Sequence, residues 1–311
     1  MTTEALLGLS ARTAPRKAAR LRREGNAGPV LVVVLAIVAL WYAAAILMNW
    51  QGVVDAAGRA GEQLSTGEIL LATMEQERPL LPAPHQILVE LKKTVFDIPI
   101  TSRRNLLFHA WVTLSSTLLG FGLGALLGIV LAVLIVHVKT LERSLMPWII
   151  SSQTIPILAI APIIIVVLGS IGITGLFPKA IISAYLCFFP VTISMVKGLT
   201  SPDPMQRDLM RTYSASLSQT FWKLRLPASL TYLFAGLKVA VAISLIGAIV
   251  GELPTGAQAG LGARLLAGSY YGQTIQIWAA LFGAAILAST LVAAVSLAER
   301  VLNRSMGARP A

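Results

Sequence analysis

The side chains of this chain that could do chemistry are few, and their spacing supports no catalytic site. No Gly-Lys-Ser or Gly-Lys-Thr sequence occurs, so the chain has no phosphate-binding loop for a nucleotide. No Ser-His-Asp arrangement or carboxylate pair is identifiable from spacing. Lys238 and Glu252 lie within or beside apolar segments, where a charge is costly. Cys187 and the three separated histidines, His85, His109 and His137, offer no metal-ligand grouping. We expect no enzyme and no metal site.

A polar segment between long apolar runs, residues 205–227, is the best candidate for a binding surface. Read at helical spacing, its apolar residues share one face: Leu209, Met210, Tyr213, Leu217 and Phe221. The other faces carry polar and charged residues, namely Arg207, Asp208, Arg211, Ser218, Gln219 and Lys223. We expect one amphipathic helix that docks on a partner. A connector that rests on the membrane surface is the alternative interpretation.

The composition places these residues in a membrane protein. The chain has 311 residues, of which 56% are hydrophobic and 13% are charged, and its mean hydropathy is +0.75. Soluble domains are less apolar than this. The net charge of +11 does not indicate a nucleic-acid partner, because the basic residues lie mostly between hydrophobic segments.

Six apolar segments are long enough to cross a bilayer, which takes about 20 residues: 29–50, 106–137, 146–168, 177–195, 232–250 and 275–297. The sequence therefore predicts an all-α polytopic membrane protein with six transmembrane helices. With the N-terminus inside, 16 basic residues fall in cytoplasmic segments and 8 outside, most of them in one long loop. This distribution predicts an N-in, C-in orientation.

The expected organisation follows from these spans. A basic cytoplasmic tail (1–28) precedes the first transmembrane helix (29–50) and a periplasmic loop (51–104). A core (105–300), with a cytoplasmic loop at 198–230, precedes a second cytoplasmic tail (301–311). Glycines repeating every four residues at 120, 124 and 128 predict close packing between helices.

Two groups of residues are candidates for a role in transport. Neutral polar side chains within the spans would line a path or, alternatively, hydrogen-bond a neighbouring helix: Ser151, Gln153, Thr154 and Ser244. A stretch rich in glycine follows the fifth span and is either an outer gate or a tight turn. Its candidate residues are Glu252, Gly260 and Gly262.

The 205–227 segment resembles a loop of the permease subunits of bacterial ATP-binding-cassette importers. Their pattern is Glu-Ala-Ala, three residues, Gly, nine residues, Ile, one residue and Leu-Pro. Here Asp208-Leu209-Met210 stands for Glu-Ala-Ala, Ser214 for Gly and Leu224 for Ile, and Leu226-Pro227 matches in identity. Further segments between residues 80 and 300 are similar to the nitrate/sulfonate/taurine branch: Leu81-Pro82-Ala83-Pro84, Ile155-Pro156, Ala161-Pro162, Ser214-Ala215-Ser216, Gly236-Leu237-Lys238 and Gly260-Leu261-Gly262.

The resemblance implies a type I importer fold in the bacterial inner membrane. Two permease subunits would pair around the path, and the departures at Asp208 and Ser214 favour a heterodimer. A periplasmic binding protein would deliver the substrate, and a cytoplasmic ATPase dimer would bind ATP and Mg²⁺, leaving no cofactor in this chain. The residues implied in coupling to the ATPase are Asp208, Leu209, Met210, Arg211, Tyr213, Ser214, Ala215, Ser216, Leu217, Leu226 and Pro227.

Relatives in this branch carry nitrate, sulfonates, taurine, pyrimidine or thiamine precursors, and riboflavin. The neutral path residues favour a nitrogen heterocycle, because a strong anion would favour Arg or Lys along the path. Nitrate, sulfonate or taurine is the alternative. Two other classes are an ion-coupled secondary transporter, which would use intramembrane carboxylates or an inverted repeat, and a membrane scaffold without transport.

Overall fold

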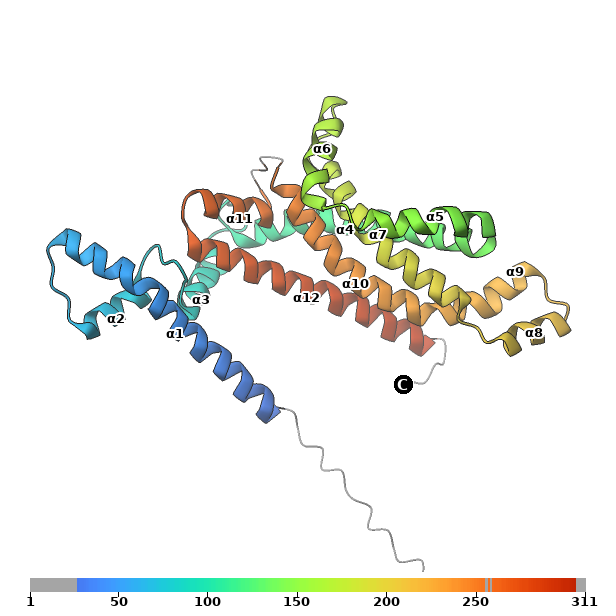
Figure 1. Ribbon diagram of the computed structural model, residues 1–311, viewed down its shortest axis with the longest axis horizontal. Coiled ribbons are helices and arrows are strands. Elements are labelled where there is room, and N and C mark those ends of the chain that lie inside the picture. Colours follow the sequence, from blue (N-terminus) through green and yellow to red (C-terminus); the bar gives the residue numbers. More distant parts are fainter. Residues whose placement is uncertain (1–26, 255–256, 258, 306–311) are drawn as a thin grey trace, which may run out of the picture.

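The computed structural model describes residues 27–254, 257 and 259–305, and these residues form helices joined by short connections (Figure 1). In chain order the elements are α1 Ala27–Ala60, α2 Thr66–Glu75, α3 Pro84–Lys92, the π-helical turn η1 Lys93–Asp97, α4 Leu106–His137, α5 Lys139–Ser152, α6 Ile157–Ser170, α7 Leu176–Thr200, α8 Pro204–Thr212, α9 Leu217–Thr220, the π-helical turn η2 Phe221–Arg225, α10 Leu226–Glu252, α11 Leu261–Tyr270 and α12 Thr274–Ser305. The all-α prediction is confirmed. The expected tails lie mostly outside the described residues.

Five stretches of helix are long and apolar enough to cross a membrane: α1, α4, α7, the run from Leu217 to Glu252, and α12. The expected span over 146–168 is not one straight helix. It is two helices, α5 and α6, which meet at an angle of 100°. Pro156 explains the break, since proline lacks an amide hydrogen and disfavours a helical conformation in the residue before it. Pro162 and Pro190 lie inside helices, in α6 and α7 respectively. Counting the bent pair as one span gives six.

The packing of α4 on α7 supports that count. Gly120, Gly124 and Gly128 successively face Ser183, Cys187 and Val191, so the two helices run parallel. A Cβ on Gly124 would lie 2.7 Å from the carbonyl oxygen of Ala184, which confirms the expected close approach. Because α4 and α7 are parallel, residues 138–175 must return the chain across the length of the bundle. The α5–α6 pair is the part of the chain that makes this return.

Helix α10 completes a three-helix centre with α4 and α7. It runs antiparallel to α7, with Gly236 beside Ser194 and Gly247 beside Ser183. The Ser183 hydroxyl donates to the carbonyl of Ser244 at 2.8 Å, and the Ser244 hydroxyl donates to the carbonyl of Thr117 at 3.1 Å. These buried hydroxyls tie all three helices together in a region where no water competes.

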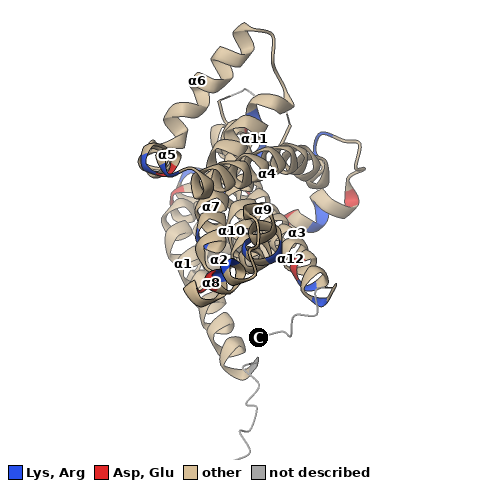
Figure 2. Ribbon diagram, turned by 90° about the vertical axis from the view of Figure 1, so that its right-hand side faces the viewer, with Lys and Arg blue, Asp and Glu red and all other residues tan. Residues whose placement is uncertain are grey.

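The charged side chains sit mainly at helix ends and connections. Figure 2 shows α6 and the body of α4 without Lys, Arg, Asp or Glu. Lys238, whose charge within an apolar segment is costly, pairs with Glu299 of α12 at 2.5 Å. This ion pair connects α10 to α12 and neutralises both groups.

The 51–104 segment has more helix than the expected loop. Helix α1 is 34 residues long and continues to Ala60, beyond the expected end at 50. Asn49 of α1 is buried. Its side-chain oxygen accepts a hydrogen bond from the amide of Leu80, and its side-chain nitrogen donates one to the carbonyl of Leu81. These bonds fix the chain before α3. Helix α2 begins with a capping box in which hydrogen bonds from Ser65 hold the pKa of the Glu68 carboxyl below its usual value.

Candidate functional site

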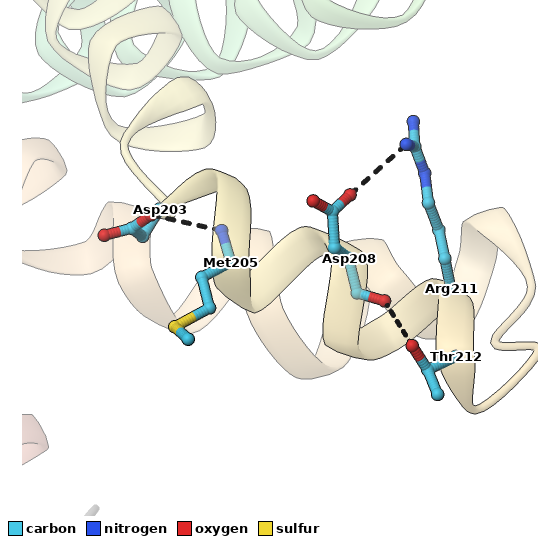
Figure 3. A network of polar contacts seen from close by, with 5 residues as sticks. All are labelled: Asp203, Met205, Asp208, Arg211 and Thr212. Carbon is cyan, nitrogen blue, oxygen red and sulfur yellow. Dashed lines mark hydrogen bonds and ion pairs between the residues drawn. The ribbon is translucent and has the colours of Figure 1, made fainter.

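Helix α8 is a short polar helix that projects from one end of the bundle, which we call the α8 end (Figure 1). The Asp203 carboxylate accepts the amide of Met205 at 3.1 Å (Figure 3), and the amide of Asp203 donates to the side-chain oxygen of Gln206 at 3.2 Å. Pro204 occupies the first turn, where its missing amide hydrogen costs nothing. The sequence therefore sets the start of α8 locally, before any tertiary contact.

The end of α8 is set by Ser214. Its amide donates to the carbonyl of Arg211 at 2.8 Å, and the amide of Ala215 donates to that of Met210 at 3.0 Å. This pair of bonds is the Schellman pattern, which places its central residue in the left-handed region. Ser214 has φ of 49° and is the one non-glycine residue with positive φ in the described part of the chain. The importer pattern has glycine at this position, and the structure shows why glycine suits it.

The prediction of one continuous amphipathic helix is wrong. The Ser214 turn separates α8 from α9, and Leu217 and Phe221 therefore do not extend the α8 face. Phe221 is half-buried against the ring of His137, and Met210 is half-buried. Pattern reading missed this turn because Ser214 is not a glycine.

The apolar face that α8 does present is formed by Met205, Leu209 and Tyr213, which we call the α8 stripe. Their spacing of four residues places them on one side of the helix. They are 80%, 56% and 77% exposed, respectively, and Leu217, across the turn, is 85% exposed. Apolar side chains this exposed at the end of a bundle indicate a partner surface.

Charged groups border the α8 stripe. Arg211 and Asp208 form an exposed ion pair at 3.3 Å, and the hydroxyl of Thr212 donates to the carbonyl of Asp208 (Figure 3). A groove of about 390 Å³ runs between α8 and the chain that returns to α10, and its lining includes Arg207, Asp208, Arg211 and Arg225. An exposed pair of this kind contributes little to stability but can orient a partner.

Leu226 and Pro227 lie where the chain re-enters the bundle. Leu226 packs on the buried cluster of Met195 and Leu199, and Pro227 lies in the first turn of α10. The π-helical turn η2 comes directly before them. Proline cannot donate to the carbonyl four residues back, and a wider turn accommodates its ring. The segment that carries α8 is thus anchored on the core at its C-terminal side.

The opposite end, which we call the α11 end, holds a buried carboxylate. Glu252 is fully buried, accepts the hydroxyl of Thr113 at 2.9 Å and accepts the amide of Gly262 at 2.7 Å. A Cβ on Gly260, which has φ of 126°, would lie 2.2 Å from the Glu252 carboxyl carbon. The structure brings together Glu252, Gly260 and Gly262 in what we call the Glu252 clasp.

Three side chains that contact the Glu252 clasp, those of His109, Thr113 and Lys179, were not among the candidates. The amide of Gly260 donates to Nδ1 of His109, and Nε2 of His109 faces the carbonyl of Arg103 at 2.8 Å. Since Gly260 donates and Arg103 accepts, the ring is neutral with its hydrogen on Nε2. Thr113 also accepts the amide of Leu261, and the buried Lys179 interacts electrostatically with Glu252. These partners lie too far apart in sequence for any spacing rule to connect them.

The four path candidates do not lie together on one element. Ser244 is buried between helices, whereas Ser151, Gln153 and Thr154 are exposed at the α5–α6 break. The hydroxyl of Tyr185 on α7 donates to the carbonyl of Ser152 at 2.7 Å, which places an aromatic residue beside the break. The break therefore exposes neutral polar groups between α5 and α6.

Comparisons with known proteins give one consistent answer. Residues 124–308 match the family described as binding-protein-dependent transport system inner membrane component. The chain is 34% identical to the formylaminopyrimidine transport permease protein ThiX of Halalkalibacterium halodurans, over 59% of this chain and 68% of the relative. It is 32% identical to the riboflavin transport system permease protein RibX of Chloroflexus aurantiacus, over 63% and 71%. It is 28% identical to the nitrate import permease protein NrtB of Synechocystis sp., over 57% and 64%.

The matched residues include the path candidates, the segment that carries α8 and the Glu252 clasp. The description of this family as an inner membrane component fits the membrane-spanning helices of the chain. The chain therefore belongs to the family of binding-protein-dependent inner membrane components, the permease subunits of ATP-binding-cassette importers.

Proposed function

We propose that this permease carries a small nitrogen heterocycle, of the formylaminopyrimidine or riboflavin kind. The substrate would come from a binding protein at the α11 end, and an ATPase dimer at the α8 stripe would drive transport. The observation that carries the substrate proposal is the neutral α5–α6 break. Residues 144–178, which include it, contain no charged side chain. A path for a strong anion would favour Arg or Lys.

Two relatives support the same substrate class. ThiX is named for formylaminopyrimidine and RibX for riboflavin, and both are more than 30% identical to this chain. Hydroxyl and amide groups at Ser151, Gln153 and Thr154 suit the ring nitrogens and carbonyls of such solutes, since each offers a donor and an acceptor. Tyr185, beside them, offers an aromatic face for stacking.

The α8 stripe is the proposed contact with the ATPase, which would hold ATP and Mg²⁺. An amphipathic helix lays its apolar side in a groove of its partner and uses the charged rim for orientation. Met205, Leu209 and Tyr213 provide the apolar side, and Asp208 and Arg211 the rim. The chain has no nucleotide-binding loop, so the energy must come from that partner.

A second permease subunit completes the proposed assembly. Helix α6 projects from the bundle (Figure 1), and its Leu158, Ile163 and Val166 are exposed. A second permease subunit would cover this apolar surface of α6 where it borders the transport path. The non-consensus Asp208 and Ser214 favour a partner with a more typical loop, and hence a heterodimer. The Glu252 clasp, as the outer gate, would move with the α11 end when the two subunits close.

The test is uptake by proteoliposomes that contain the purified permease pair, its ATPase and its binding protein. Labelled formylaminopyrimidine and riboflavin should enter with ATP inside, and a hundredfold excess of taurine or nitrate should not compete. A proton or sodium gradient without ATP should drive nothing, in contrast to a secondary transporter. Uptake of taurine or nitrate in preference to the heterocycles would refute the substrate proposal and leave the importer assignment intact.

A further inference from the structure

A polar cavity of about 330 Å³ lies at the α11 end, separate from the Glu252 clasp. It is built from α3 with η1, the connection before α4, the helix α11, and the start of α12. The lining residues that matter here are Glu90, Lys93, Arg104, Arg264, Gln273 and Gln276. They come from four distant parts of the sequence, so the cavity exists only in the folded chain. We call it the cationic cavity.

The cationic cavity has more positive than negative charge. Among the described residues that line it, Lys93, Arg104 and Arg264 are cations and Glu90 is the one carboxylate. Arg264 is half-buried, and burial lowers the pKa of its guanidinium. The nearby Glu90 opposes this effect, while the like charge of Arg104 adds to it. Among the described lining residues three cations thus face one carboxylate, so an incoming anion would find favourable electrostatics at Arg264.

The donors suit a carboxylate in particular. A guanidinium presents a planar fork of N–H groups that matches the two oxygens of a carboxylate. The side-chain amides of Gln273 and Gln276 add further N–H donors on the same cavity wall. The cavity has room for an acidic side chain and for the chain segment that presents it.

The two sides of the α3–η1 segment differ in chemistry. On the other side, Leu88, Leu91, Val95 and Phe96 line an apolar cavity of about 480 Å³ that also borders α12. Exposed apolar residues such as Phe96 suit contact with lipid. Lys92 lies at this apolar cavity, next in sequence to Lys93 of the cationic cavity. The polar side is therefore the one available to a partner in water.

We propose that the cationic cavity receives an Asp or Glu side chain of the binding protein and fixes its position over the path. This inference rests on the proposed function, which places that protein at the α11 end. A charge pair across such an interface speeds encounter and selects the partner more than it adds affinity. Arg264 would give the buried contact, and Lys93 and Arg104 the exposed steering charges.

The experiment measures ATP hydrolysis by the assembled transporter in phosphatidylcholine nanodiscs as its binding protein is titrated. The binding protein is identified as the one that stimulates the unmodified complex. Arg264→Gln with Arg104→Gln should raise the half-saturating concentration about tenfold, while unstimulated hydrolysis and the maximal rate stay unchanged. Added salt should weaken stimulation of the unmodified complex more than that of the variant. The matched control is Lys92→Gln, which should leave the titration unchanged.

Charge exchange gives a second measurement if the double variant assembles poorly. Lys93→Glu alone should weaken stimulation, and an Asp→Lys or Glu→Lys change on the binding protein should restore it. Unchanged half-saturation in both variants overturns the inference. An effect seen only when the nanodiscs contain phosphatidylglycerol also overturns it, because a lipid headgroup would then be the ligand. Failure of any binding protein to stimulate the unmodified complex would instead refute the proposed function, and this inference with it.

Discussion

At the scale of single residues, Ser214 shows how one side chain sets the shape of the candidate ATPase-binding segment. It holds a left-handed conformation that costs a residue with a Cβ about 1–2 kcal/mol. Its backbone amide, and not its side chain, closes the Schellman pattern. The departure from the family's glycine thus carries a cost in backbone energy.

The change Ser214→Gly should therefore stabilise the turn by about 1 kcal/mol, or about fivefold in the protection of its amides from hydrogen exchange. Ser214→Val should do the reverse, because a β-branched residue tolerates positive φ poorly. Ser218→Gly is the matched control. It lies in helical backbone, and there glycine should lower protection. Equal effects at 214 and 218 would show that the Ser214 backbone is not strained.

Position 260 requires glycine both for its backbone conformation and for the space that a Cβ would occupy. The change Gly260→Ala should destabilise the purified chain and displace Glu252, since the new Cβ would overlap the buried carboxylate. Gly272→Ala is the control, because Gly272 has φ of 65° and no atom near a Cβ. Thermal unfolding should show the larger loss for Gly260→Ala. Equal losses would assign the effect to backbone strain and not to the Glu252 clasp.

At the scale of elements, the parallel pairing of α4 and α7 organises the bundle. Small residues let the backbones approach, and the buried hydroxyls of Ser183 and Ser244 fix their register against α10. The pairing also requires the broken α5–α6 segment to return the chain. The neutral polar break and the tight three-helix centre are therefore consequences of one arrangement.

This arrangement predicts different outcomes for two neighbouring glycines of α4. Gly124→Leu should destabilise the chain by about 1–3 kcal/mol or prevent insertion of a folded bundle, because α7 leaves no room. Gly122→Leu should be tolerated, because nothing lies near a Cβ at that position. The yield of monodisperse protein in detergent and its thermal unfolding measure the difference. Tolerance of both changes would contradict the close α4–α7 packing.

At the scale of the whole molecule, the bundle separates the two proposed partner surfaces. Helix α8, which carries the α8 stripe, lies at one end, and α3 and α11, which border the cationic cavity, lie at the other (Figure 1). Helices α7, α10 and α12 connect these ends, so a movement imposed at the α8 end can reach the α11 end through packed helices. A permease needs only two stable arrangements that its partners bias.

The double variant Leu209→Ala with Tyr213→Ala tests the α8 end. Each large side chain contributes roughly 1.5–3 kcal/mol when buried, so loss of both should remove the co-purifying ATPase or uncouple its hydrolysis from transport. Arg211→Glu, at the exposed rim, should have a smaller effect. Leu71→Ala with Tyr270→Ala, two exposed residues of α2 and α11, is the control and should keep the ATPase. A double α8 variant that transports at the unmodified rate would leave 205–227 as a surface connector.

The sequence by itself determined the class of this protein. Hydrophobic length alone decides that a segment can span a bilayer, and local capping residues such as Asp203 and Pro204 set where α8 begins. The family resemblance rested on the spacing of short motifs, which survives changes in identity such as Ser214. These features depend on neighbours in the chain, so they can be read from it.

The tertiary structure alone decided the features that depend on contacts between residues far apart in the sequence. It paired Lys238 with Glu299 and joined Glu252 to Thr113 across 139 positions of sequence. It also assembled the cationic cavity from four separate segments. A buried carboxylate such as Glu252 needs hydrogen-bond donors, and residues far away in sequence can supply them. The excess of positive charge in the cationic cavity likewise arises only when the fold brings its lining residues together. No local pattern in the sequence specifies either.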